Sequence, residues 1–257
     1  SLAGHLKLRN LILLFDNNSV SIDGPTSLAV SDNHEKRFKS YGWDYINING
    51  HNYKEIFKSL KKAQKSKKPV AIACKTTIGY GSPNKSGKSS IHGSPLGLDE
   101  IKLVRNTLNW NFKPFEIPIK ILNEWRKIGK KGQKLENDWN KIFKKKKTIV
   151  NNSLKNDFTK ILKIEKQKAV KELKGFATRK SSELTLNALT SITSNLIGGS
   201  ADLAGSNNTK TKHHKIVKPG DFIGNYIHYG VREHAMSGIM NGLALHSNFI
   251  PYGGTFL

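Results

Sequence analysis

Four short segments of the sequence carry side chains that could bind a metal, bind phosphate or move a proton. The first of them is Asp16-Asn17-Asn18, directly after the apolar run Leu11–Phe15. Polar side chains just beyond a strand lie where open parallel sheets bind ligands. Hard cations such as Mg²⁺ take oxygen ligands and often share them with phosphates. Taken alone, however, a polar turn closed by Asp23-Gly24 is the simpler explanation of this segment.

The second segment is a loop rich in Gly, Ser and Pro that presents one histidine. It runs from Lys75 to Gly97, and His92 stands between Ile91 and Gly93. An imidazole exchanges protons near neutral pH and also donates hydrogen bonds to phosphate or hydroxyl groups. A single loop histidine is nevertheless more often an ordinary surface residue, so His92 alone indicates little.

The third and fourth segments pair an arginine and a glutamate with helix starts. Arg179 lies beside the start of a predicted helix and is followed by a Gly-Gly-Ser-Ala-Asp-Leu stretch and by Ser206. A guanidinium group matches the oxygens of a phosphate. Glu233, in Arg-Glu-His-Ala, opens another helix. A helix-entry arginine and a glutamate that interacts with the helix dipole remain the alternatives for each residue alone.

Taken in order, the four segments resemble those of the transketolases. Residues 16–24 are similar to the second half of their cofactor motif, whose first half, Gly-Asp-Gly, would lie upstream. Asn stands at position 17, where many members have Asp, and Val stands at position 20, where Ile is common. The resemblance implies that the Asn18 side-chain oxygen and the Val20 carbonyl hold Mg²⁺, or Ca²⁺ in its place. That ion would bridge the diphosphate of thiamine diphosphate.

The same resemblance implies roles for the other candidate residues. His92 would reach the cofactor and the oxygens of the sugar, and Arg179 with Ser206 would hold the substrate phosphate. Asp202 would line the cofactor pocket at a subunit interface, and Glu233 would activate the cofactor through its pyrimidine ring. Phe256 resembles the first of two aromatic residues around that ring, and the second is expected beyond Leu257.

The activity that this resemblance implies is transfer of a two-carbon ketol unit, glycolaldehyde, from a ketose phosphate to an aldose phosphate. The unit would be carried on a thiamine diphosphate adduct, as in pentose phosphate and Calvin-type sugar interconversion. A homodimer with its active site between the subunits is also implied. Dihydroxyacetone synthase, which uses formaldehyde as the acceptor, is a close alternative.

The elements that must position these residues read as an α/β fold, with parallel sheets covered by helices. A buried strand is expected at Leu11–Phe15, and the other expected strands are 45–48, 70–74 and 196–197. Helices are expected at 35–41, 53–63, 99–108, 181–192 and 232–245. We predict three parts: the latter part of a diphosphate-binding domain (1–118), a Lys-rich helical linker (119–174) and the first part of a pyrimidine-binding domain (175–257). We expect an internal fragment that is inactive alone.

Composition bears on the partners and the compartment. The net charge of +24 suggests a basic nucleic-acid-binding module as an alternative of another class, which predicts salt-sensitive binding dominated by Lys144–Lys147. The lysines are scattered over the chain with few aromatic residues between them, so we expect a solvated surface and no nucleic-acid partner. Cys74 is the only cysteine, which favours a reducing, cytoplasmic setting. No apolar run reaches the ~20 residues of a membrane span, so no membrane partner is expected.

Overall fold

The computed structural model describes residues 1–154, 157–172, 175–246 and 248–256, and the side chains of these residues except 147–154. The chain divides into two compact units, Ser1–Gly129 and Lys130–Leu257. Among the lysines of the predicted linker, the Lys147 side chain and all of Lys155 and Lys174 lie outside the described residues, as does Leu257. Each unit is described by itself below.

Unit 1 is built on a three-stranded parallel sheet with the order β1-β5-β4. Its elements are α1 (Leu2–His5), β1 (Ile12–Asn17), β2 (Val20–Ser21), β3 (Gly24–Pro25), α2 (His34–Ser40), β4 (Asp44–Asn49), α3 (Tyr53–Ala63), β5 (Val70–Lys75) and α4 (Leu98–Thr107). The strands are in register, with Ile12 and Asp44 both opposite Val70. β5 is central and its first four residues are buried, as a continuous apolar run predicts.

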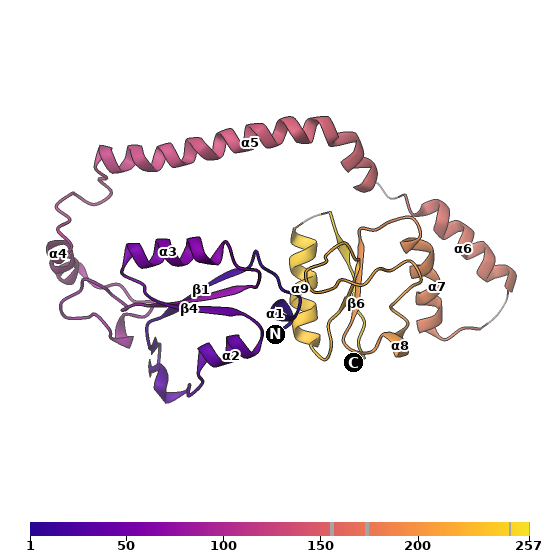
Figure 1. Cartoon of the computed structure of the whole chain (residues 1–257), viewed down its shortest axis with the longest axis horizontal. Coiled ribbons are helices and arrows are strands. Elements are labelled where there is room, and N and C mark those ends of the chain that lie inside the picture. Colours follow the sequence, from indigo (N-terminus) through magenta and orange to yellow (C-terminus); the bar gives the residue numbers. More distant parts are fainter. Residues whose placement is uncertain (155–156, 173–174, 247, 257) are drawn as a thin grey trace. The chain divides into compact units, whose positions relative to one another are not determined.

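The helices α2 and α3 cover opposite faces of this sheet (Figure 1). Because successive side chains of a strand point to opposite faces, β4 serves both helices. Tyr45 lies 5.9 Å from Phe38 of α2, measured between ring centroids, while Ile46 packs on the core cluster that includes Ala63 of α3. Asn52 caps α3, since its side chain accepts hydrogen bonds from the first backbone N–H groups of that helix.

The predicted burial of the first strand is wrong. β1 forms where expected, but Leu13 is 39% exposed and Leu14 is 59% exposed. The reason is position in the sheet: β1 is an edge strand, and β5 is its only strand partner among the described residues. An apolar run alone does not distinguish a central strand from an edge strand whose faces are partly uncovered.

Unit 2 repeats this plan with a second parallel sheet, ordered β7-β6-β8. Its elements are α6 (Thr159–Glu172), α7 (Thr178–Thr190), β6 (Leu196–Ser200), α8 (Ala204–Asn207), β7 (Tyr226–His228), α9 (Glu233–Leu245) and β8 (Ile250–Pro251). All five residues of β6 are buried. In Figure 1, α7 and α9 flank β6 on its two sides. The α/β fold with parallel sheets and covering helices is therefore confirmed.

The long helix α5 (Ile119–Leu154) has 36 residues and begins within unit 1. Together, α5 and α6 occupy most of the stretch predicted as a helical linker. Nearly all of the described side chains of α5 are exposed. The boundaries that we predicted for the two domains and the linker stay a prediction. Within the described ranges, every helix is too short or too polar to cross a bilayer.

Candidate functional site

In unit 1 the carboxyl ends of the three parallel strands surround a hollow of about 620 Å³. It is lined by polar residues that end or follow each strand, including Asn17 at the end of β1, Asn49 at the end of β4, His51 after β4, and Thr76 after β5. The Thr76 hydroxyl donates a hydrogen bond to Asp16. This is the end of the strands at which parallel sheets bind ligands, and the roles expected for the first segment stay predictions.

The segment after β1 forms a tight turn that leads into the β2–β3 hairpin. Ser19 adopts a left-handed conformation with φ 63°, and the Asn18 Oδ1 atom accepts a hydrogen bond of 3.0 Å from the Val20 N–H group. An amide oxygen has a second lone pair for a metal. The residue opposite Val20 in the hairpin is Pro25, which has no N–H to donate to the Val20 carbonyl. Both predicted ligand atoms thus belong to one turn and fit a hard cation.

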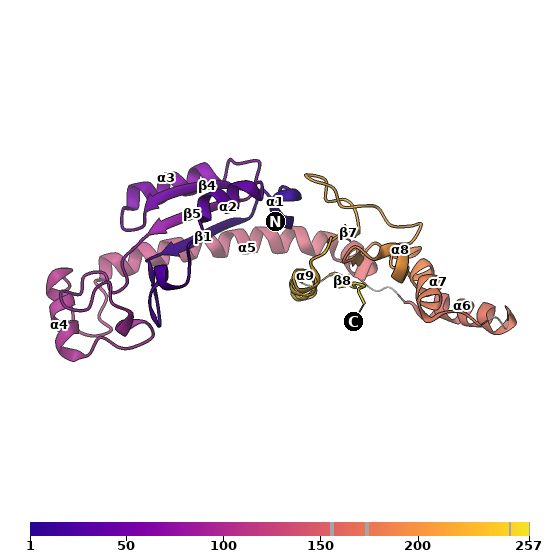
Figure 2. The same ribbon diagram turned by 90° about the horizontal axis from the view of Figure 1, so that it is seen from below.

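His92 ends a short 3-10 turn, Ser89–Ile91, in the loop between β5 and α4. Its side chain is exposed, whereas the neighbouring Ile91 is buried. Figure 2 shows this loop, α4 and the β2–β3 hairpin gathered at one end of the unit 1 sheet. Within the described chain no hydrogen bond joins His92 to Asn18. The structure thus places the segments that carry the two predicted residues at the same end of the sheet.

One buried carboxylate holds the loop that carries His92. Glu100, in the first turn of α4, is 7% exposed and accepts hydrogen bonds from the Ser82 hydroxyl and from the backbone and side-chain nitrogens of Asn84, the latter two at 2.9 and 3.0 Å. These hydrogen bonds, first from Ser82 and then from Asn84, lower the pKa of Glu100 to about 2. Sequence reasoning missed Glu100. An acidic residue in the first helical turn after a Ser- and Asn-bearing loop was the available signal.

A second missed residue, His51, braces the start of the same loop. Its Nε2 atom accepts a hydrogen bond of 3.0 Å from the Thr77 N–H group, and its ring stacks on Tyr80 with centroids 3.9 Å apart. Asn-Gly-His-Asn at the end of a predicted strand was a signal for a residue at this edge. His51 and Glu100 together hold the first half of the Gly-rich segment, from Thr77 to Asn84.

In unit 2 the structure brings Arg179 and Ser206 together. Arg179 is the second residue of α7, and its Nη1 atom donates a hydrogen bond of 3.3 Å to the backbone carbonyl of Ser206 in α8. Both residues are exposed. A guanidinium group carries five N–H donors, so the others stay available for the oxygens of a phosphate.

Asp202 follows the carboxyl end of β6 in a left-handed conformation with φ 61°. Its turn is fixed by Ser200, whose hydroxyl donates to the Gly254 carbonyl and accepts from the Leu203 N–H group, both at 3.1 Å. An aspartate held at positive φ is uncommon and requires support from the surrounding structure. Here that support leaves the Asp202 carboxylate exposed at the sheet edge.

Glu233 and Phe256 follow the other two strands of the same sheet. Glu233 is the first residue of α9, which starts soon after β7, and Phe256 comes shortly after β8. Both side chains are exposed, Phe256 by 59%. Because β6, β7 and β8 are parallel, Asp202, Glu233 and Phe256 all follow the same, carboxyl end of the sheet.

The predicted residues therefore fall into two groups, each at the carboxyl ends of one sheet or next to it. Asn18, Val20 and His92 belong to unit 1, and the other group, in unit 2, comprises Arg179, Asp202, Ser206, Glu233 and Phe256. The described residues contain no cluster of three His, Cys, Asp or Glu side chains that could hold a metal. A metal in unit 1 would thus depend on amide and carbonyl oxygens from this chain.

Comparison with known families decides between the family resemblance and the simpler explanations of each segment taken alone. The family model "Transketolase, thiamine diphosphate binding domain" matches residues 1–166, and "Transketolase, pyrimidine binding domain" matches residues 174–257. The chain belongs to the transketolase family. Its two matched domains are those of a thiamine diphosphate enzyme, in the order that the sequence motifs indicate.

Curated transketolases align with the whole chain. The chain is 40% identical to transketolase from Sinorhizobium medicae over 266 residues, which covers 100% of the chain and 38% of that relative. It is 44% identical to transketolase 2 from Escherichia coli, with 100% of the chain and 40% of the relative covered. The chain thus spans about two fifths of the length of these transketolases.

Solved transketolase structures have the same fold. The crystal structure of transketolase from Campylobacter jejuni superposes with a TM-score of 0.85 at 37% identity, covering 99% of the chain and 39% of that protein. Transketolase from Pichia stipitis in complex with sedoheptulose 7-phosphate gives a TM-score of 0.83 at 34% identity, with 99% and 40% covered.

Proposed function

We propose that the protein to which this chain belongs is a transketolase that moves a glycolaldehyde unit from a ketose phosphate to an aldose phosphate. The observation that carries the proposal is the match of both transketolase domains, in order, over residues 1–166 and 174–257. The positions of the candidate residues support it, because in each unit they collect at the end of a parallel sheet where ligands bind. Thiamine diphosphate supplies the carbanion chemistry when it is bound.

The turn after β1 would hold the metal and, through it, the diphosphate. The Asn18 Oδ1 atom and the Val20 carbonyl are the ligand atoms from this chain, and Mg²⁺, or Ca²⁺ in its place, is the ion that such oxygen donors favour. The hydrogen bond from Val20 N–H to Asn18 Oδ1 fixes the amide, so that its second lone pair is set in direction before an ion binds.

Substrate recognition would rest on Arg179 and Ser206. The Arg179 guanidinium is already oriented by its hydrogen bond to the Ser206 carbonyl, at 3.3 Å. A sugar phosphate would bind to the remaining N–H donors of Arg179 and to the Ser206 hydroxyl. Since a guanidinium group is always charged, this grip would hold across the physiological pH range.

Proton handling would fall to Glu233 and His92. Glu233 would hold a proton at the pyrimidine ring of the cofactor, a role that its exposed carboxylate at the start of α9 leaves open. His92 would donate to and accept from the sugar oxygens, and Asp202 with Phe256 would line the cofactor pocket. We further propose that the protein forms a homodimer, and that the exposed sheet ends of both units build the active site in that assembly.

The test is a ketol-transfer assay on the protein made from the complete reading frame, with ribose 5-phosphate or formaldehyde as the acceptor. We expect transfer to ribose 5-phosphate, and Glu233→Gln should lower kcat by at least about 10²-fold, the usual contribution of a positioned proton carrier. Glu172→Gln, an exposed glutamate on α6, is the matched control. Preference for formaldehyde would indicate a dihydroxyacetone synthase, and no transfer to either acceptor would contradict the proposal.

The cofactor and phosphate roles are tested separately. Asn18→Ala should reduce the gain in thiamine diphosphate affinity that Mg²⁺ provides, and calorimetry with and without Mg²⁺ measures this gain. Arg179→Gln should raise KM for sugar phosphates and leave the binding of the cofactor unchanged, while Arg126→Gln on the exposed face of α5 should alter neither. If Arg179→Gln left KM unchanged, Arg179 would be only a helix-entry residue.

A further inference from the structure

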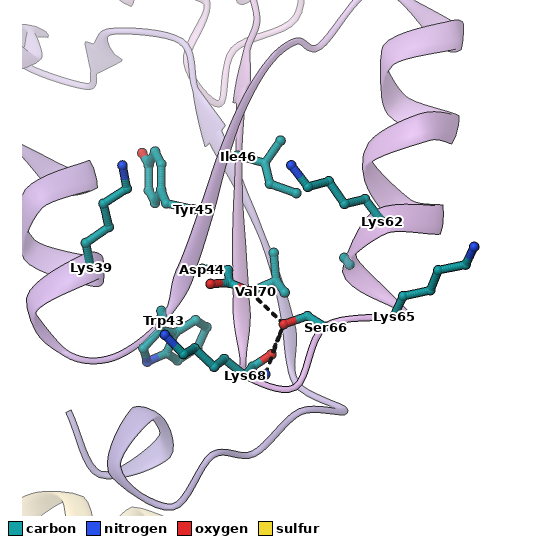
Figure 3. Close-up of a pocket in the computed structure, with 11 residues that line it drawn as sticks. Lys39, Trp43, Asp44, Tyr45, Ile46, Lys62, Lys65, Ser66, Lys68 and Val70 are labelled. Carbon is teal, nitrogen blue, oxygen red and sulfur yellow. Dashed lines mark hydrogen bonds between the residues drawn. The ribbon is translucent and has the colours of Figure 1, made fainter.

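A second hollow in unit 1 lies at the end of the sheet opposite to the candidate site. It has a volume of about 650 Å³ and opens beside Asp44 and Val70, the first residues of β4 and β5 (Figure 3). Ile46, Ala63 and Val70 form an apolar floor on the α3 side of β4, and Trp43 and Tyr45 line the hollow on the opposite side, next to Phe38 of α2. Pockets for small organic molecules have volumes of roughly 300–1,000 Å³ and a mainly apolar lining, and this hollow fits both.

The rim of the hollow is strongly basic. Four lysines line it: Lys39, Lys62, Lys65 and Lys68. Lys39 is paired with Glu35 at 2.6 Å. Within the part of the chain that the structure describes, the other three ammonium groups have no carboxylate within 4.0 Å. Three of the four lysines around this hollow are therefore not ion-paired within the described residues.

The side chains differ in direction, as Figure 3 shows. Lys62 extends from α3 toward Ile46, and Lys68 points toward Trp43, whereas Lys65 points away from the strands. The base of the hollow is fixed, since the Ser66 hydroxyl donates to Asp44 at 2.8 Å and accepts from the Lys68 N–H group at 2.9 Å. Lys62 thus borders the hollow on the α3 side of the strands, and Lys68 borders it beside Trp43, so that the two unpaired cations flank the hollow from different sides.

Negative charge near the hollow offsets only part of this excess. Asp44 carries one carboxylate, and the C-terminal ends of α2 and α3 each contribute roughly half a negative charge. With Glu35 neutralising Lys39, the three unpaired lysines still leave a net positive site. Lysines also serve to interact with helix C-terminal dipoles, but that role needs fewer cations than are present here.

The shape of the hollow favours a small molecule over a peptide strand. β4 is an edge strand, so an acidic peptide added to it would need the outer edge of all six residues. The hollow contacts only Asp44, Tyr45 and Ile46, the first half of the strand. A compact ligand with an apolar body and an anionic group matches the apolar floor and the basic rim.

We propose that this hollow binds a small organic phosphate, with its phosphate groups held by Lys62 and Lys68 and its organic part on the apolar surface formed by Ile46 and Val70. The site is separate from the candidate cofactor site, because it lies at the amino ends of the strands. It would add a second ligand to the chain, independent of the proposed ketol transfer.

Calorimetric titration of the chain with ATP, free of divalent metal, tests this site. We expect saturable binding of one molecule that weakens with salt. Lys62→Gln/Lys68→Gln should weaken the affinity at least about tenfold, since two contact charges are lost. Lys58→Gln/Lys67→Gln removes the same charge from the same helix and loop outside the hollow, and it should change the affinity less than about twofold. Circular dichroism checks that the variants, all at exposed lysines, keep the fold.

Two further titrations separate the possible sources of binding. Tripolyphosphate should bind several-fold more weakly than ATP, and Asn18→Ala should leave ATP binding unchanged. Equal losses in the two double variants would show that ATP follows only the overall charge and would overturn the site. Equal affinity for tripolyphosphate and ATP would overturn the organic part of the ligand, and loss of ATP binding in Asn18→Ala would place the phosphate at the cofactor site instead.

Discussion

The two units present candidate residues at equivalent sheet ends but hold them by different forces. In unit 1, the loop with His92 is fastened by hydrogen bonds to the charged Glu100. In unit 2, the turn with Asp202 follows two glycines that lie against large side chains: a Cβ atom at Gly199 would overlap the Tyr229 ring, and one at Gly198 would overlap Tyr252. The Asp202 turn also has the hydrogen bonds of Ser200, but close packing is the added constraint in unit 2, so different changes should damage each end.

The largest effect is expected from added volume in unit 2. Gly199→Ala should lower the free energy of unfolding by about 1–3 kcal/mol or more, because the buried Tyr229 ring has no space into which to move. Urea unfolding with hydrogen exchange along β6 measures this. Gly238→Ala is the control: it lies in α9 with nothing within 4 Å, and should instead stabilise the helix by about 0.5–1 kcal/mol. A harmless Gly199→Ala would contradict the packing account of this edge.

The next effect is a difference in acid sensitivity. Burial, aided by His213 and Lys210, lowers the pKa of His214 in unit 2 to about 4. The unfolded state therefore takes up this proton first, and unit 2 should lose stability as the pH falls from about 6.5 to about 4. The neutral ring is needed because its Nδ1 atom accepts from the Thr211 N–H group at 2.8 Å.

Urea midpoints at pH 7 and pH 5 measure this loss. His214→Gln should flatten the pH dependence of unit 2, while His246→Gln, at an exposed position, should leave it unchanged. An unaltered slope in His214→Gln would assign the acid sensitivity to other groups.

The smallest effect is local and belongs to unit 1. Glu100→Gln should reduce hydrogen-exchange protection at the Asn84 amide and loosen the His92 loop, while β5 keeps its protection. Since the pKa of Glu100 is lowered to about 2 from an unfolded value near 4.3, its contribution is complete above about pH 5 and is lost as the pH falls toward 2. Asp99→Asn, which affects an exposed neighbour paired with Lys102, should not change the loop. Loss of protection throughout the sheet would show that Glu100 supports the whole unit.

The sequence predicts the elements well where the pattern is local. The helix expected at 53–63 is α3, and the strand expected at 70–74 is β5 with one more residue. The short strands β7 and β8 were not predicted, since three- and two-residue strands have no detectable period. The burial of β1 was wrong because strand order depends on partners far apart in the sequence.

In the candidate site, too, local patterns are predictable from the sequence and long-range contacts are not. Motif order identifies residues such as Asn18 and Glu233, whose roles stay predictions, and the structure adds where each leaves its sheet. Motif order could not identify Glu100 or His51. Their importance comes from hydrogen bonds to Ser82, Asn84 and Thr77 that only the folded loop creates. Single residues that brace a loop carry no motif of their own.

The exposed leucines of β1 have a consequence for handling the protein. A strand with Leu14 59% exposed and one edge unpaired in the described chain is a template on which another molecule can add a strand. The chain made alone will therefore have a solubility limit set by this strand, in spite of its net charge of +24.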